Sequence, residues 1–138
     1  GGYAALVAAS RTPQIYQCVI AGAAVSDTHM QVGYYSDRMR GAQEMEQINM
    51  WRDSVNPIDE AEKVNVPMLL VHGGVDQRVP PAHVRKYLDE LDKYNKTYKY
   101  VELEGADHFS NTLFYHHQYD LYTSMIDFLK KDCGPGGL

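Results

Sequence analysis

The sequence predicts an α/β fold with three parallel strands and flanking helices. Between residues 66 and 108 an apolar run, a loop, a helical segment, a second strand-like run and another loop follow one another. This is the strand–helix–strand order that places two strands side by side and parallel. A further run at 16–25 is continuously apolar, which predicts a strand buried on both faces.

The composition is that of a globular protein. The 138 residues are 44% hydrophobic and 22% charged, which fits one domain or a piece of one and excludes a disordered chain. A net charge of −5 without a cluster of Lys and Arg argues against a nucleic-acid partner. The apolar runs are far shorter than the roughly 18 residues of a membrane span, so we expect no membrane segment in this chain.

The chain opens on Gly1-Gly2-Tyr3, and a helix-forming run of small residues follows at 4–10. Gly1 can be read as the remnant of a tag. It can also be read as the last glycine of a nucleophile elbow, G-x-S-x-G, in which glycines let the helix pack against the preceding strand. The second reading places the serine two residues before Gly1, outside this chain.

The middle of the chain gives weaker signals. Residues 26–56 yield one predicted helix over 42–52, and a short helical turn is expected over 58–64. Tyr34, Tyr35 and Trp51 in this region are read as core aromatics. The strand at 67–72 comes next.

The later elements are more clearly patterned. Pro80-Pro81 opens a predicted helix over 83–94, whose apolar residues recur at helical spacing. A strand is expected over 98–103. The last helix is expected over 118–131, and the glycine-rich end is a frayed tail. The residues expected to face the core from these two helices are Val84, Tyr87, Leu88, Leu91, Leu121, Met125, Phe128 and Leu129.

Two residues that can carry chemistry follow two of these strands. Asp76 lies in the loop after 67–72, and His108 lies in the loop after 98–103. Open α/β sheets place their chemistry at the carboxyl ends of the strands, so we expect the two side chains within hydrogen-bond reach. An acid followed in chain order by a histidine is the second half of a Ser…Asp…His triad of the α/β-hydrolase type.

Each of these residues has a plainer interpretation. Asp76 can be an ordinary turn residue after two glycines. Asp107 is a rival for the acid, although a residue adjacent to His108 reaches around the ring with difficulty. His72 is expected to be packed or hydrogen-bonded at its strand end. Adjacent histidines such as His116-His117 point to different faces of a helix, so we expect no metal site and no cofactor.

Three motifs follow one another along the chain: Gly1-Gly2-Tyr3 as the end of an elbow, His72-Gly73-x-x-Asp76-x-x-Val79-Pro80, and Glu104-Gly105-x-x-His108. Together they resemble the prolyl oligopeptidase family of serine peptidases. The resemblance covers the whole chain, and it implies that residues 1–138 are the C-terminal part of an α/β-hydrolase catalytic domain, beginning just after the nucleophile elbow. It is strongest toward the dipeptidyl peptidase IV branch, which has cysteines at the places of Cys18 and Cys133.

The resemblance also implies roles for single residues. His108 would take the proton from the serine and return it to the leaving amine, while Asp76 would hold the imidazole tautomer. Arg78 would contact the substrate backbone, although it can equally be a solvated surface charge, and the dipeptidyl branch usually has Asn there. The apolar pocket for the residue before the scissile bond would be lined by Val79, Val25, Tyr34 and Tyr35.

Cys18 and Cys133 can be buried thiols or a disulfide, and the resemblance favours the disulfide. Such a bond would imply an oxidising compartment, hence a periplasmic or secreted protein.

The resulting hypothesis is a serine-type peptidase acting on peptide substrates, whose serine lies outside this chain. The alternatives are a small serine esterase of the same fold and a non-catalytic binding domain. The expected partners are a missing N-terminal part, a β-propeller in the dipeptidyl branch, and further copies of the chain. A homo-oligomer is expected because the strand at 16–25 has a bare apolar edge.

Overall fold

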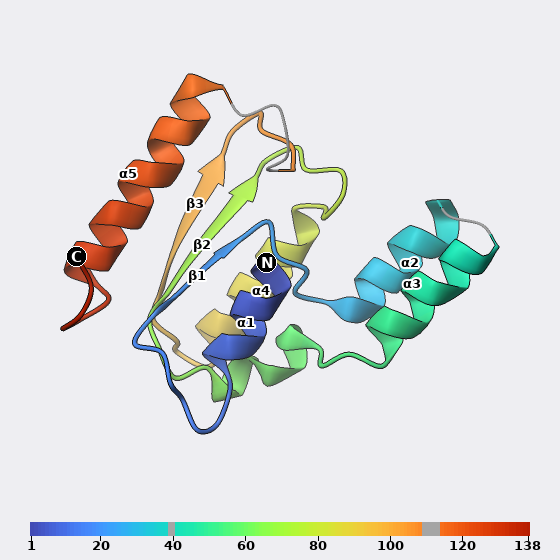
Figure 1. The fold of residues 1–138 in the computed structure, drawn as a ribbon, viewed down its shortest axis with the longest axis horizontal. Helices are drawn as coiled ribbons and strands as arrows, with labels where there is room; N and C mark the ends of the chain where they lie inside the picture. Colours follow the sequence, from blue (N-terminus) through green and yellow to red (C-terminus); the bar gives the residue numbers. More distant parts are fainter. Residues whose placement is uncertain (39–40, 109–113) are drawn as a thin grey trace.

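The fold is one parallel sheet with helices on both faces. The computed structural model describes residues 1–38, 41–108 and 114–138. The strands β1 (Val19–Gly22), β2 (Met68–Gly73) and β3 (Tyr98–Leu103) pair in the order β1-β2-β3, parallel throughout. The helices α1 (Gly2–Ala9) and α4 (Ala82–Lys93) lie on one face of the sheet, and α5 (Tyr115–Lys131) lies on the other (Figure 1).

Residues of β2 alternate between two cores because successive strand side chains point to opposite faces. Met68 and Leu70 join the larger core with residues of α1 and α4. Leu69 and Val71 join the smaller core with Phe128 of α5. All six residues of β2 are buried, so it is the central strand of the described sheet.

The predicted strand at 16–25 is shorter than expected, and only one of its faces is fully buried. β1 covers Val19–Gly22, where Val19 and Ala21 are buried and Ile20 and Gly22 are half-buried. The reason is the placement of α5, which packs on β2 and β3 and only partly covers the face that carries Ile20. The expectation of burial on both faces was therefore wrong for this chain.

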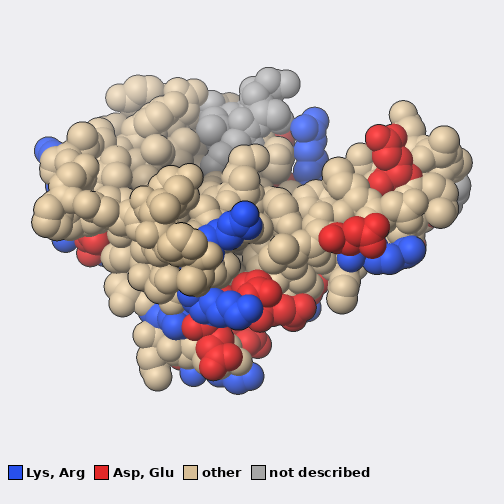
Figure 2. Space-filling view, turned by 60° about the horizontal axis from the view of Figure 1, so that its bottom comes forward, with Lys and Arg blue, Asp and Glu red and all other residues tan. Residues whose placement is uncertain are grey.

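A helical hairpin projects from this body. It consists of α2 (Thr28–Arg38) and α3 (Ala42–Arg52), which pack on each other and extend away from the sheet (Figure 1). The prediction over 42–52 agrees with α3, but α2 was missed. Figure 2 shows the hairpin as a protruding lobe with acidic and basic side chains interspersed.

The remaining elements lie close to their predicted places. A 3-10 helix, η1 (Pro57–Lys63), replaces the predicted turn, and α1 and α4 begin two residues and one residue earlier than predicted. α5 begins three residues earlier than predicted, at Tyr115, because His117 stabilises its first turn by accepting the backbone N–H of Phe114.

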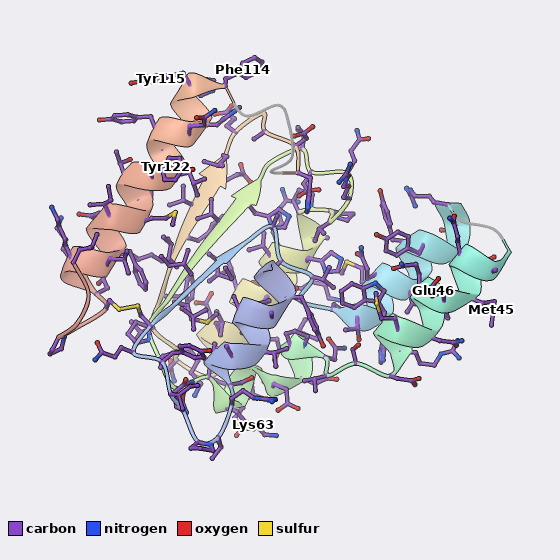
Figure 3. All side chains as sticks on the ribbon, viewed as in Figure 1. Met45, Glu46, Lys63, Phe114, Tyr115 and Tyr122 are labelled. Carbon is purple, nitrogen blue, oxygen red and sulfur yellow. A yellow bond between two sulfur atoms is a disulfide. The ribbon has the colours of Figure 1, made fainter. Side chains whose placement is uncertain are left out.

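A disulfide joins the start of β1 to the end of α5. Cys18, directly before β1, is bonded to Cys133, two residues after α5, with 5.2 Å between their Cα atoms (Figure 3).

Among the described residues no helix is long and apolar enough to cross a bilayer.

Candidate active site

The candidate site lies where β2 and β3 end. β2 ends at Gly73, and β3 ends at Leu103, its register partner. The backbone N–H groups of Gly74 and Val75 donate to the carbonyl oxygens of Leu103 and Ala106, at 3.0 Å each, and so bind the two loops together. The loop that carries the acid therefore lies against the loop that carries the histidine.

Gly73 allows this close approach. A Cβ at this position would overlap the carbonyl oxygens of Ala106 and Asp107. Any larger residue after His72 would have to push the two loops apart. This explains in physical terms why a glycine follows the histidine at the end of β2.

The structure brings Asp76 and His108 together. Oδ2 of Asp76 lies 2.9 Å from Nδ1 of His108. The Asp76 side chain is 0% exposed, while that of His108 is 29% exposed, so the acid is enclosed and the imidazole reaches solvent. This is a geometry in which a buried carboxylate orients the ring of a histidine through Nδ1.

The second carboxylate oxygen of Asp76 is also occupied. Oδ1 accepts the backbone N–H groups of Arg78 and Val79, both at 2.9 Å. A buried carboxylate with these three hydrogen bonds is a well-satisfied acceptor. Since it offers no hydrogen of its own as a carboxylate, Nδ1 of His108 is the donor, and the unshared pair of the ring is then on Nε2.

His72 supports the same loop from β2. Its Nε2 lies 2.8 Å from the carbonyl oxygen of Val79 and 3.7 Å from Oδ2 of Asp76. Burial lowers the pKa of His72, against the opposing effects of the Val79 carbonyl and the Asp76 carboxylate. A neutral His72 donates its Nε2 hydrogen to Val79 and closes the turn around Asp76.

A pocket of about 510 Å³ opens beside this pair. Arg78 and Tyr34, two of the predicted substrate-binding residues, line it together with His108. The Arg38 guanidinium lies 3.8 Å from the centre of the Tyr34 ring. The other described lining residues are Val75, Gln77 and Asp107.

The other predicted pocket residues are not among those that line this pocket. Val25 and Val79 are buried, at 6% and 5% exposure. Tyr35 is half-buried and packs edge-on against Tyr34 at 5.7 Å between ring centres. Of the five predicted pocket residues, Arg78 and Tyr34 therefore line the described pocket, and Val25, Val79 and Tyr35 do not.

Three buried polar residues behind the site had no assigned role in the sequence analysis. They are Gln31, His83 and His117, each at most 2% exposed. Helical spacing was the available signal for His83, since it shares one buried face of α4 with Tyr87 and Leu91. His117 donates from Nε2 to the carbonyl oxygen of Glu104 at 2.7 Å and so anchors the histidine loop.

The start of α1 packs tightly on the segment that follows β1. A Cβ on Gly2 would overlap the carbonyl oxygen of Gly22 and crowd Ala24. The helix therefore lies directly on the end of β1.

The fold and the paired loops define an α/β-hydrolase arrangement. The family model of the prolyl oligopeptidase family matches residues 1–136, and this chain belongs to that family.

Known structures support the fold. An acylaminoacyl peptidase from Pyrococcus horikoshii is similar with a TM-score of 0.76 at 17% identity, over 99% of this chain and 24% of that one. Dipeptidyl peptidase 4 from Porphyromonas gingivalis is similar with a TM-score of 0.73 at 20% identity, over 95% of this chain and 18% of that one. A puromycin-hydrolyzing peptidase from Mycobacterium tuberculosis is similar with a TM-score of 0.71 at 18% identity, over 99% of this chain and 22% of that one.

This chain therefore spans about a quarter or less of the length of these three proteins. No curated protein sequence matches it.

Proposed function

We propose that residues 1–138 are the C-terminal portion of the catalytic domain of a serine peptidase. Asp76 and His108 are the acid and the base of its Ser-Asp-His triad. The observation that carries the proposal is the 2.9 Å contact between Oδ2 of the buried Asp76 and Nδ1 of the partly exposed His108. Membership of a peptidase family favours peptides over esters as the substrate.

The roles follow from the hydrogen bonds. Asp76 keeps the hydrogen of His108 on Nδ1, so Nε2 takes the proton of the serine hydroxyl and later returns it to the leaving amine. The motif G-x-S-x-G does not occur in the 138 residues, so the nucleophile is proposed to come from outside them. Arg78 and Tyr34 are the proposed substrate contacts, because they line the pocket beside His108.

Substitution of the acid and of the base in the full protein tests this proposal. Asp76→Asn is expected to lower kcat on a chromogenic peptide by roughly 10⁴-fold, because the amide favours the wrong tautomer of His108. His108→Gln is expected to cost at least as much. Asp107→Asn is the matched control at the neighbouring acid, with an expected loss of less than about 10-fold. Full activity of Asp76→Asn would eliminate the triad, and loss only in Asp107→Asn would transfer the role of acid to that residue.

The 138-residue chain by itself is expected to show no turnover, since the covalent route needs a nucleophile. A fluorophosphonate probe should leave it unlabelled and should label the full protein at a single serine. Labelling of any serine within these residues would contradict the proposal. A full protein that neither labels nor turns over a peptide or an ester would indicate a non-catalytic binding domain. Turnover of esters alone would indicate an esterase.

We further propose two kinds of partner. One is the N-terminal remainder of the same protein, with a β-propeller as in the dipeptidyl branch. The other is a second copy of the chain. Among the described strands β1 pairs with β2 alone, which leaves one edge of β1 for pairing.

A further inference from the structure

Three polar residues far apart in the sequence form a buried chain of hydrogen bonds behind the acid loop, residues 76–79. His83 lies in the first turn of α4, Gln31 lies in α2, and Ser26 lies between β1 and α2. Their exposures are 0%, 1% and 1%. Because an unpaired buried polar group costs free energy, each polar atom here is expected to be hydrogen-bonded, and its partner shows whether it donates or accepts.

The partners of the His83 ring determine its tautomer. The backbone N–H groups of Ser26 and Asp27 each lie 3.3 Å from Nδ1, and both can only donate. Nδ1 therefore accepts, and the single ring hydrogen of a neutral imidazole is on Nε2. Burial lowers the pKa of His83 to about 4, which keeps the ring neutral.

The tautomer then orients Gln31. Nε2 of His83 lies 3.1 Å from Oε1 of Gln31 and donates to it. The amide nitrogen of Gln31 is left to donate to the carbonyl oxygen of Arg78, at 3.2 Å. Each bond in the chain is thus determined by the one before it.

This series of hydrogen bonds ends on the peptide group between Arg78 and Val79, whose N–H binds the carboxylate of Asp76. The carbonyl of Arg78 and the N–H of Val79 belong to one planar peptide unit. Gln31 holds the oxygen of this unit, and Oδ1 of Asp76 holds its N–H. Rotation of the plane would break both bonds, so Gln31 restrains the group that positions Asp76.

We propose that His83 and Gln31 are positioning residues that hold the acid loop, and through Asp76 the base His108, in its working geometry. The proposal rests on the proposed function for its catalytic consequence, but the restraint itself is a property of the loop. Misplacement of a reacting group by about 1 Å can cost on the order of 10²-fold in rate, which is why such a restraint matters.

Two substitutions of Gln31 test the hydrogen bonds that link His83 to Arg78. Gln31→Met removes both hydrogen bonds with a side chain of similar length. Gln31→Glu keeps an acceptor for His83 and, when ionised, removes the donor to Arg78. Val84→Ala is the control, because Val84 follows His83 on α4, is buried at 4% exposure and belongs to the apolar core.

Amide hydrogen exchange measured by NMR gives a readout that does not depend on turnover. In both Gln31 variants the amides of Arg78 and Val79 are expected to exchange on the order of 10-fold faster relative to those of Leu69 and Leu70 in β2. Val84→Ala should leave this ratio unchanged. Ratios within about 2-fold of the wild type in both Gln31 variants would overturn the proposal.

The wild-type protein supplies a second measurement if a variant fails to fold. The ¹⁵N shifts of the His83 ring should report an unprotonated Nδ1 and a protonated Nε2, and the opposite tautomer would overturn the proposal. In the full protein, Gln31→Met should lower kcat by on the order of 10-fold or more with little change in KM. An altered exchange ratio without any peptidase activity would retain the restraint and reject the proposed function.

Discussion

At the scale of single residues, the buried His83 makes the stability of the fold depend on pH. His83 is fully enclosed, and burial is the largest cause of its lowered pKa of about 4, against an ordinary value of 6.5. Below pH 6.5 the His83 imidazole becomes protonated in the unfolded chain, whereas in the folded chain it stays neutral until the pH approaches 4. Stability from this group is therefore complete above pH 6.5 and is lost as the pH falls toward 4.

The expected loss is about 3 kcal/mol in the free energy of unfolding between pH 6.5 and 4, at about 1.4 kcal/mol per pH unit. Urea unfolding across this range measures it. His83→Gln has no titrating group there, so its unfolding free energy should fall less steeply. Parallel curves for the two proteins would show that His83 is not neutral in the folded state.

At the scale of elements, the disulfide ties α5 to the sheet. Cys18 and Cys133 are 115 positions apart in the sequence. In the chain-entropy model, a bond that closes a loop of this length stabilises the fold by on the order of 4–5 kcal/mol. Phe128 of α5, buried in the smaller core with Leu69 and Val71 of β2, also attaches this helix to the sheet.

Replacement of both cysteines by serine is expected to lower the free energy of unfolding by about 4–5 kcal/mol, measured by urea unfolding under oxidising conditions. A reducing agent should destabilise the native protein by a similar amount and leave the double variant unchanged. A difference below about 1 kcal/mol would mean that packing alone holds α5 in place.

At the scale of the whole molecule, apolar surface remains uncovered. Tyr115 and Tyr122 lie on α5 and Phe114 directly precedes it, and Phe114 and Tyr115 point away from the sheet (Figure 3). The exposed large apolar residues of this helix and its N-cap are Phe114, Tyr115, Tyr119, Tyr122 and Ile126. Together with the free edge of β1, this surface favours association, because large apolar patches seldom stay exposed.

We therefore expect the isolated 138-residue chain to form a dimer or a larger symmetric assembly. Light scattering at micromolar concentration measures its mass. If the proposed N-terminal remainder precedes these residues, it would cover the same edge instead. A clean monomer of the isolated chain would contradict the expectation and would mean that the edge of β1 is protected within the chain.

Much of the architecture could be predicted because it depends on local pattern. The apolar runs, the Pro-Pro start of α4 and the helical spacing of Val84, Tyr87 and Leu91 located strands and helices close to their observed places. α2 was missed because it packs on α3 and not on the sheet, so no apolar stripe marks it. Its signal was Asp27, whose Oδ1 accepts the N–H groups of His29 and Met30 as a helix cap.

The sequence by itself determined the order of strand, acid, helix, strand and histidine. The rule for parallel sheets then placed Asp76 and His108 together at the carboxyl ends of their strands. The tertiary structure alone decided which polar side chains are buried. Ser26, Gln31 and His83 are separated by as many as 57 positions, and their hydrogen bonds form only when α2, α4 and the acid loop meet. Local pattern reports which face of an element is apolar, whereas a buried polar chain depends on partners that other elements bring.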